Sequence, residues 1–300
     1  MSRNKPPLSW AFWHPHQGLW NWTLVSAIRK AVPVAPIYKA IMLVVILLDT
    51  LFLFLHALVT RIGALGLSKV FSKARLPEDM SVLYLDAGTH KEGVELSFVV
   101  DSILPPICSN FEAYGFEASQ QSYEHAARKF ADRKNIHIVH TALTHTLPAN
   151  GKLRLYKDLD SGIGDSLYRE TAEYEEVEAK RLSDFLIENH LVTNNTIVLL
   201  RMNIEGAEDD VLRDLVESGL AQSIDGYFGM WDDVSKIDVE RDAEFRTFLA
   251  RYRIHTFTFN ERDLRWFLRR KCIAYHVQTR IIQGVRKRQR SLSSGSTRTA

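Results

Sequence analysis

Short apolar runs and helical patterns alternate along the middle of the chain, and this alternation constrains the fold more than any other feature. Ser81 to Asp86 is a short apolar run that closes on a glycine loop. Val94 to Leu104 has a helical pattern that two prolines end, and Glu112 to Glu117 is a second strand-like run. Strands separated by helices form βαβ units, in which strands pair in parallel and helices cover both faces of the sheet. The sequence therefore predicts an α/β fold with a Rossmann-like, doubly wound, mainly parallel sheet.

Further helix and strand signals continue along the chain, and together they define a domain at residues 76–283. They lie at Gln121 to Asp132, Ile136 to Leu143, Ala179 to Glu188, Thr196 to Glu205, Glu208 to Ser218, Ser223 to Met230, Ile254 to Phe259, Asp263 to Leu268 and Cys272 to Val277.

A long apolar run precedes this domain. Residues 1–39 are basic and rich in tryptophan, and they lead into Ala40 to Val59, about 20 apolar residues that could cross roughly 30 Å of hydrocarbon as a helix. An ionised Asp49 within the run would cost about 2.5–3.5 kcal/mol, and His56 adds a second polar group. We predict a single-pass membrane-anchoring helix at residues 40–60, with a helix lying in the membrane interface or packed on the domain as the alternatives. Basic residues flank both ends, so the side of the membrane that holds the domain stays open.

The segments beside the domain have their own character. Residues 61–75 are predicted to link the apolar helix to the domain. Residues 284–300 are basic and rich in serine and threonine, with almost nothing to bury, and we predict a disordered tail there.

Composition excludes several classes of function. With 46% hydrophobic residues and a net charge of +2, the chain is globular and no nucleic-acid partner is predicted. Cys108 and Cys272 lie far apart and flank no metal-ligand spacing, so both are expected to be ordinary thiols. The oligomeric state stays open.

Three loops are expected to form one site, because ligands of such sheets bind at the carboxyl ends of the strands. These loops are Asp86 to Gly93, Glu117 to Ser119 and Asn203 to Glu208. Gly88 permits a tight turn with close backbone approach, and Glu117 is placed to accept hydrogen bonds from a pair of ribose hydroxyls. A dinucleotide site would have GxGxxG opening its helix, which this chain lacks. The pattern therefore favours S-adenosylmethionine over a nicotinamide cofactor.

The order of six segments resembles the FkbM-type methyltransferase family: DAGTHKEG, FEAS, IVHTALTH, GDSL, VEAKRLSDFL and RMNIEGAEDDVL. The resemblance covers roughly Leu76 to Leu220, and the EGAE step after an apolar strand is its most specific part. It implies a class I methyltransferase domain with a seven-stranded sheet, S-adenosylmethionine as cofactor and a hydroxyl group as acceptor, often on a sugar or natural product. By similarity, the cofactor would be held by Asp86, Gly88, Thr89, His90, Glu117, Ala118 and Asn203.

The chain departs from the family pattern in two places. His90 stands where the family usually has Asn, and Lys91-Glu92 makes the first loop one residue longer. Arg201 and Asn203 replace the more usual Lys and Asp, which removes one carboxylate as a candidate base. His90 and Glu205 are then the nearest titratable groups.

Methyl transfer is an in-line displacement, so alignment of acceptor and methyl group supplies much of the rate. A hydroxyl acceptor also benefits from a base, because an alcohol is a weak nucleophile at neutral pH. His90, with an ordinary pKa near 6.5, and Glu205 are the predicted catalytic residues. The alternative is that His90 hydrogen-bonds the loop backbone and that Glu205 orders the first turn of the next helix.

The segment GYFGMWDDVSK follows the fifth predicted strand and combines aromatic with acidic residues. Tyr227, Trp231 and Asp232 would stack on and hydrogen-bond the acceptor, a glycan, lipid or other small molecule. Asp232 and Asp233 with Asn203 would suit magnesium or calcium, but adjacent acids are more often a helix cap, so no metal is predicted. The chief rival function is a membrane-tethered binding or scaffold protein that keeps the fold without catalysis, which Asn203 favours. A nicotinamide oxidoreductase is the third hypothesis.

Overall fold

The computed structural model describes residues 76–157, 165–231, 234–258 and 266–296, together with the isolated positions 36, 37, 40, 44 and 51. The chain divides into two compact units, residues 1–70 with 257–275, and residues 71–256 with 276–300. Most of the predicted N-terminal segment, apolar helix and linker, residues 1–75, lies outside the described residues. In the described part of the chain, no helix is both long and apolar enough to span a membrane.

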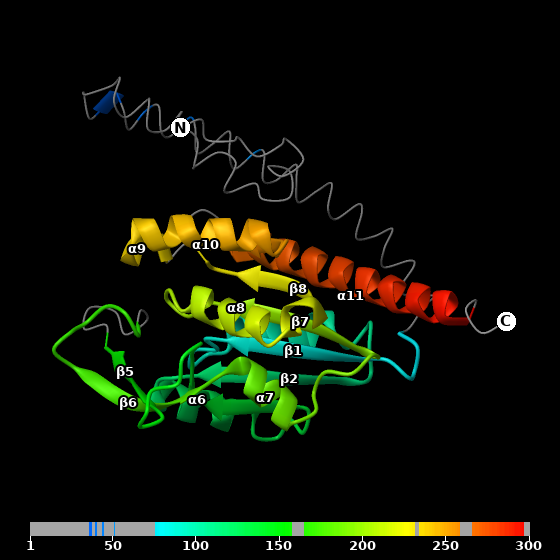
Figure 1. The fold of residues 1–300 in the computed structure, drawn as a ribbon, viewed down its shortest axis with the longest axis horizontal. Helices are drawn as coiled ribbons and strands as arrows, with labels where there is room; N and C mark the ends of the chain where they lie inside the picture. The colour runs from blue at the N-terminus through cyan, green and yellow to red at the C-terminus, as the bar shows by residue number, and fades with distance from the viewer. Residues whose placement is uncertain are drawn as a thin grey trace. The chain divides into compact units, whose positions relative to one another are not determined.

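A parallel sheet forms the centre of the second unit, as predicted. Its order is β3-β2-β1-β7-β8, and β9, which begins at the boundary between the units, follows β8. All four pairings among the first five strands are parallel, and Figure 1 shows β8, β7, β1 and β2 side by side. The strands are β1 (Ser81–Ala87), β2 (Phe111–Glu117), β3 (Ile136–His140), β7 (Thr196–Met202), β8 (Ile224–Gly229) and β9 (Thr256–Thr258).

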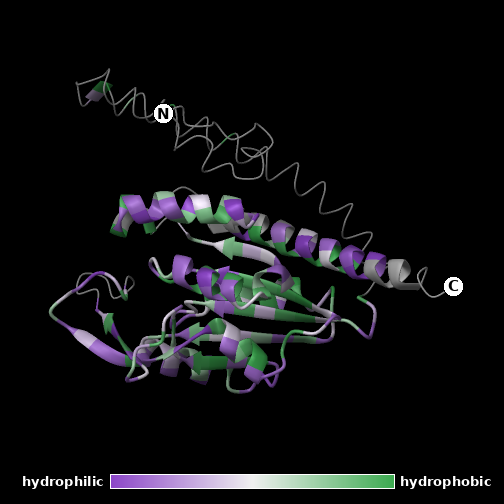
Figure 2. Cartoon of the chain, viewed as in Figure 1, coloured by the Kyte–Doolittle hydropathy of each residue, from purple (hydrophilic) through white to green (hydrophobic). Residues whose placement is uncertain are grey.

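The two central strands explain why this sheet is covered on both faces. Every residue of β7 and all but the first of β1 are buried, and apolar residues dominate both strands. Figure 2 shows the same hydrophobic character along the central strands. Strands buried on both faces read as continuous apolar runs, which is typical of parallel sheets between helical layers. Among the described residues the main sheet has six strands, whereas seven were predicted. Cys272 to Val277, one of the segments with a helix or strand signal, lies within a helix.

One face of the sheet packs on α7, α8, α9 and α10, and Leu85, Leu200 and Tyr227 lie in the apolar cluster between them. On the other face, Phe228 contacts His276 of α11 with ring centroids 5.6 Å apart. The helical elements are α5 (Val94–Phe98), the π-helical turn η1 (Val99–Ile103), α6 (Gln120–Phe130), α7 (Leu182–Glu188), α8 (Glu208–Glu217), the 3-10 turn η2 (Leu220–Ser223), α9 (Val234–Ile237), α10 (Val239–Arg251) and α11 (Trp266–Ser296).

A second, three-stranded sheet was not predicted. It has the order β4-β6-β5, made by β4 (Ala142–Leu143), β5 (Lys152–Tyr156) and β6 (Tyr174–Lys180). β4 pairs in parallel and β5 antiparallel with β6. Ala142, Leu155 and Val177 form a small apolar cluster in this sheet. It brings the chain after β3 back beside the main sheet.

The predicted disordered tail differs from the structure, because α11 continues through Gly284 to Ser296. Arg288 of this segment is anchored to the main sheet by two hydrogen bonds to the carboxylate of Asp225, at 2.9 and 2.8 Å. It also donates to the main-chain oxygen of Thr196. A basic residue that looks solvated in the sequence therefore holds the helix against the domain. Residues 297–300 lie outside the described residues.

Candidate functional site

The carboxyl ends of β1, β2, β3 and β7 meet at one edge of the main sheet. The Gly88 amide donates to the Phe116 carbonyl at 2.9 Å, and the Asn203 amide donates to the Ala87 carbonyl at 3.0 Å. The Thr141 amide donates to the Glu117 carbonyl at 3.0 Å. The loops that follow these four strands are therefore tied to one another by main-chain hydrogen bonds.

A cavity opens at this edge, and all three loops that the sequence predicted to be neighbours line it. The second sheet and the chain beside it close another side. The lining residues are Gly88, His90, Phe116, Glu117, Ala118, Ser119, Ser122, Thr141, Ala142, Leu143, Leu155, Asp165, Leu167, Asn203, Ile204, Glu205 and Ala207. Of the predicted cofactor residues, Gly88, His90, Glu117, Ala118 and Asn203 are brought together here.

Gly88 makes the close approach that its position suggested. Its φ of +81° lies in the left-handed region, which favours glycine. A Cβ atom built on it would lie 2.0 Å from the main-chain oxygen of Asn203. The turn after β1 therefore packs directly on the loop after β7, with no room for a side chain between them.

Glu117 ends β2 with its carboxylate on the cavity wall. One oxygen accepts a hydrogen bond from the His90 amide at 2.6 Å, and the other accepts from the Ser119 amide at 2.9 Å. Burial raises the pKa of the carboxyl group, and these amides offset part of that increase. A carboxylate has about four acceptor positions, so each oxygen keeps capacity for one more donor. The geometry suits a ligand that offers two adjacent hydroxyl groups.

His90 and Glu205 both adopt left-handed backbone conformations, with φ of 60° and 51°. Non-glycine residues in this region cost about 1–3 kcal/mol each and cluster at functional sites. The Nε2 atom of His90 is buried without a hydrogen-bond partner among the described residues. Burial lowers the pKa of the imidazole, with Lys91 adding to the effect. The neutral form of the ring is therefore favoured at pH 7, and His90 is one of the residues that line the cavity.

Asn203 supplies a second buried polar atom without a partner among the described residues, its Oδ1. Glu205 differs, because Nη2 of Arg169 lies 3.2 Å from one oxygen of its carboxylate. Glu205 also holds the rim of the cavity, since the Ser166 hydroxyl donates to its main-chain oxygen at 3.1 Å. His90 is thus the better placed of the two predicted catalytic residues.

Asp86 is not among the cavity-lining residues, although the sequence predicted it as a cofactor contact. It is fully buried, and one of its oxygens accepts a hydrogen bond from Nη1 of Arg201 at 2.9 Å. The same nitrogen donates to the Gly88 carbonyl at 2.8 Å, and Nη2 lies 3.7 Å from Glu95. Burial raises the pKa of the Asp86 carboxyl group, and Arg201 offsets part of this increase. The pair fixes the glycine turn from beneath.

Thr89 also points away from the cavity lining. Its hydroxyl donates to the Asp86 carbonyl at 3.0 Å, and its side chain lies against β2, where a Cβ on Gly115 would be 2.5 Å from its Oγ1. It stabilises the turn internally.

The predicted acceptor contacts lie elsewhere. Tyr227 and Trp231 are buried in the apolar cluster under α8 and α10, and neither lines the cavity. The Tyr227 hydroxyl donates to the Ala221 carbonyl at 2.7 Å, and the Trp231 ring packs beside that of Phe245. Both are core residues: Tyr227 belongs to β8, and Trp231 follows that strand and packs in the same buried cluster. Asp232 and Asp233 lie outside the described residues.

The second sheet contributes a polar rim that the sequence did not reveal. Nζ of Lys157 lies 3.0 Å from Asp165 and 3.2 Å from the Ser119 hydroxyl, and it also pairs with Glu175. Lys157 therefore joins β5, β6 and the start of α6 at the cavity edge. Two segments of this wall, Thr141 to Leu143 and Asp165 to Leu167, belong to the family-like motifs IVHTALTH and GDSL. Those motifs were therefore the available clue, although the sequence analysis assigned them no place in the site.

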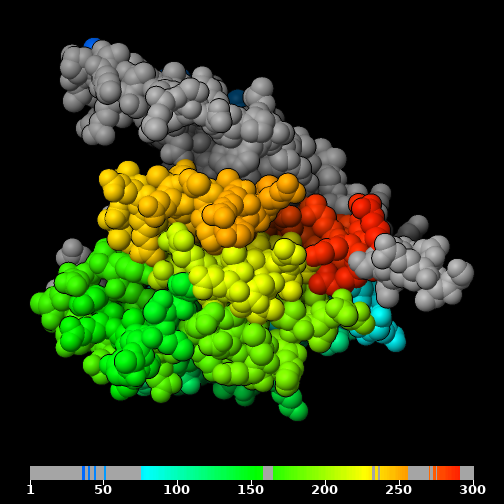
Figure 3. All heavy atoms as spheres, in the orientation of Figure 1, coloured from blue at the N-terminus to red at the C-terminus, as the bar shows by residue number. Residues whose placement is uncertain are grey.

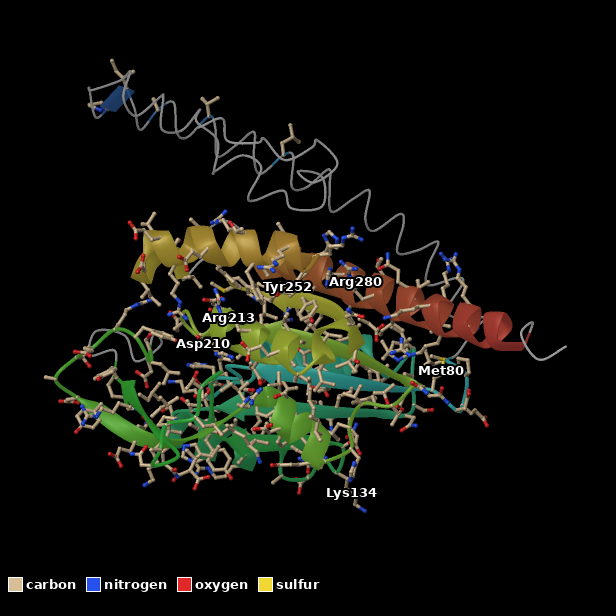
Figure 4. The ribbon with its side chains drawn as sticks, viewed as in Figure 1. Met80, Lys134, Asp210, Arg213, Tyr252 and Arg280 are labelled. Carbon is tan, nitrogen blue, oxygen red and sulfur yellow. The ribbon has the colours of Figure 1, made fainter. Side chains whose placement is uncertain are left out.

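Tyr168 anchors that rim to the helices. Its hydroxyl hydrogen-bonds Asp210 of α8, and Arg241 of α10 lies over its ring, 4.4 Å from the centroid. Figure 4 labels Asp210 beside Arg213 in this helix layer. Burial raises the pKa of the tyrosine, with Asp210 adding to the effect. The segment after Asp165 is therefore held in place.

Among the residues that the structure describes, no group of three or more His, Cys, Asp or Glu side chains is arranged to hold a metal ion.

Residues 86–252 match the family model described as the methyltransferase FkbM domain. No curated protein and no solved structure matches the chain.

Proposed function

Because the chain belongs to the FkbM methyltransferase family, whose domain covers more than half of its length, we propose that it transfers a methyl group from S-adenosylmethionine to a hydroxyl oxygen. The observation that carries this proposal is the cavity itself. It brings together a glycine turn, a carboxylate with spare acceptor capacity and two buried polar atoms without partners.

The residues present fit the cofactor. Glu117 would accept hydrogen bonds from the two ribose hydroxyls, one at each carboxylate oxygen. Gly88 lets the turn after β1 pack directly on the main chain of Asn203, which brings the first loop and the loop after β7 together at the cavity. Oδ1 of Asn203 and Nε2 of His90 need partners, because a buried unsatisfied polar atom costs about 1–3 kcal/mol. A polar ligand in the cavity would remove that cost.

When bound, S-adenosylmethionine supplies the electrophilic methyl group. We assign His90 as the base that would receive the proton of the acceptor hydroxyl at Nε2. Its lowered pKa keeps the ring neutral and able to accept this proton. The loop that carries it is fixed by its own amide, which donates to Glu117.

The acceptor is proposed to be a sugar, lipid or other small hydroxylated molecule. We place its entry near Glu205 and Leu167, which line the cavity. Tyr227 and Trp231 lie in the core and do not line it. We also propose that residues 40–60 form a single-pass membrane anchor, because their apolar run is long enough to cross the hydrocarbon core as a helix.

The test uses the full chain in detergent, titrated calorimetrically with S-adenosylmethionine and S-adenosylhomocysteine. Glu117→Gln removes the charge on the cavity wall, and Glu112→Gln is the matched control, because Glu112 lies on the same strand with an exposed side chain. Each hydrogen bond to a charged group contributes about 1.5–3 kcal/mol, so Glu117→Gln should weaken binding by roughly 10- to 150-fold.

A second variant separates binding from chemistry. His90→Gln should still bind the cofactor while losing about 10²- to 10⁴-fold in transfer rate. Absence of cofactor binding by the folded wild-type chain would overturn the proposal and favour the non-catalytic scaffold instead.

A further inference from the structure

A groove lies between α8 and α10, and it shares no lining residue with the cavity at the strand ends. Its volume is about 410 Å³, which is within the range of small-ligand sites, roughly 300–1,000 Å³. Figure 3 shows both helices at the molecular surface. The residues that line this α8–α10 groove are Arg213, Ala243, Glu244, Thr247, Phe248 and Arg251.

One face of α10 supplies most of the groove. Glu244, Thr247, Phe248 and Arg251 are spaced by three, four and seven residues from the first, which places them on one side of a helix. Phe245, between them in sequence, is buried in the apolar cluster beneath the helix. The helix therefore packs one side on the core and presents a mixed aromatic and polar side to the groove.

Two arginines and two aromatic rings form an alternating stack along this groove. The guanidinium carbon of Arg213 lies 5.0 Å from the centroid of the Phe248 ring, and the Phe248 and Tyr252 centroids are 4.8 Å apart. The guanidinium carbon of Arg251 lies 5.5 Å from the Tyr252 centroid. Tyr252 is 44% exposed, and Figure 4 labels it at the end of α10, with Arg213 on α8. An aromatic surface with a cation at each end is thus accessible to a planar group.

The two guanidinium groups keep donors for a ligand. A guanidinium group has five N–H donors. Arg213 donates from Nε to Asp209 at 2.8 Å, and this pair leaves its terminal nitrogens available. In the described part of the chain, Arg251 contacts the Tyr252 ring and pairs with no carboxylate. The groove can therefore hold an anion.

The same groove also contains acceptors. Glu244 is exposed and contributes a carboxylate to the lining. The Thr247 hydroxyl donates to the Ala243 carbonyl at 2.9 Å, so its oxygen can still accept a hydrogen bond. A matching ligand would combine an anionic group, a planar ring and hydroxyl or amino donors.

We propose that the α8–α10 groove binds a nucleoside monophosphate. The phosphate would pair with Arg213 and Arg251, since the planar guanidinium fork matches phosphate oxygens. The base would stack on Tyr252, as bases do on exposed aromatic side chains. Donors of the sugar or base would reach Glu244 and Thr247. An inorganic anion would leave the aromatic surface unused, and an acidic peptide would meet the carboxylate of Glu244.

The test is calorimetric titration of the full chain in detergent with adenosine monophosphate, adenosine and inorganic phosphate. It does not depend on methyl transfer. Each titration is repeated with Glu117→Gln, which changes the cavity wall and leaves the groove intact. This variant separates nucleotide bound in the groove from nucleotide bound in the cofactor cavity.

The groove variants are Arg251→Gln and Tyr252→Ala, both at exposed positions, with circular dichroism to confirm that each is folded. Arg213 is left unchanged because its partner Asp209 also pairs with Arg241, which contacts the Tyr168 hydroxyl at the cavity rim. The matched control is Arg246→Gln. It removes an exposed charge from α10 that pairs with Asp242 and does not line the groove.

We expect adenosine monophosphate to bind wild type and Glu117→Gln equally, and to bind more tightly than adenosine or phosphate alone. Arg251→Gln should weaken binding about tenfold, because a hydrogen bond to a charged group is lost. Tyr252→Ala should weaken it roughly 5- to 150-fold through the lost stacking. Arg246→Gln should change it by less than about twofold.

Three outcomes would overturn the proposal. The first is that the folded chain does not bind adenosine monophosphate. The second is that phosphate alone binds as tightly, which would make the groove a simple anion site. The third is that binding is lost in Glu117→Gln but kept in Arg251→Gln, which would place the nucleotide in the cofactor cavity.

Discussion

Replacing Asp86 by asparagine should destabilise the fold by about 3 kcal/mol, the lower end of the range for breaking a buried ion pair. Asp86 is 0% and Arg201 3% exposed, so the substitution leaves a guanidinium charge buried with less compensation. The cost stays at the lower end for two reasons. The asparagine oxygen can still accept from Arg201, and Glu95 remains 3.7 Å from the other guanidinium nitrogen. Asp86→Ala also removes the hydrogen bond and should cost closer to 5 kcal/mol.

Urea unfolding of the full chain, followed by circular dichroism, measures these differences as changes in the extrapolated free energy of unfolding. Asp101→Asn is the matched control, because Asp101 pairs with Arg133 at 2.7 Å at the surface, where both side chains are at least 40% exposed. Such a pair contributes about 0–1 kcal/mol. In the double variant Asp86→Asn/Arg201→Met, the loss should be smaller than the sum of the two single losses, since no buried charge is left alone.

One outcome would refute this reasoning. If Asp86→Asn unfolds within about 1 kcal/mol of wild type, as the exposed control does, but no longer binds S-adenosylmethionine, then Asp86 is a cofactor contact and not a structural residue.

Three further predictions follow from the site and the core. Because the pKa of His90 is lowered, its neutral form persists below pH 6.5, and the acid limb of the kcat/KM profile should lie below that pH. The limb should disappear in His90→Gln, and an acid limb above pH 6.5 would contradict the assignment of His90 as the base. Gly88→Ala should destabilise the chain and weaken cofactor binding more than Gly151→Ala, measured by calorimetry and urea unfolding, because both glycines have positive φ but only Gly88 lacks space for a Cβ. Tyr227→Phe should cost about 1 kcal/mol of stability through the lost hydrogen bond to Ala221 and leave the transfer rate unchanged; a loss of rate without a loss of stability would return Tyr227 to the acceptor site.

The central strands were predictable because their signal is local. β1 and β7 are mainly apolar runs, and they lead into a glycine turn and an acidic loop. α8 has three acidic residues in its first turn, which is common at helix starts because of the helix dipole. β6 was missed because its sequence, YEEVEAK, is mostly charged, and only Val177 is fully buried. Its pairing with β5 and β4, and not its own composition, makes it a strand. The predicted element at Ala179 to Glu188 therefore spans the end of β6 and α7.

The site was predictable to the extent that it follows from strand ends. Glu117 ends one strand, and His90 and Asn203 follow two others, and the carboxyl ends of these strands must meet at one sheet edge. The partner of Asp86 could not be predicted in the same way, because Arg201 is 115 positions away and the pair depends on register between β1 and β7. Whether an acid at a strand end points into the cavity or beneath the turn is decided by that register.

The sequence by itself determined the alternating fold, the glycine turn, the acid that ends β2 and the family to which the chain belongs, since each depends on neighbours in the chain or on motif order. The tertiary structure alone decided which polar residues line the cavity and that Tyr227 and Trp231 belong to the core. It also decided that the basic segment near the C-terminus is helical and is held on the sheet by the pair of Arg288 with Asp225. Those outcomes depend on contacts between residues that are distant in sequence, and burial gives such contacts their energetic weight.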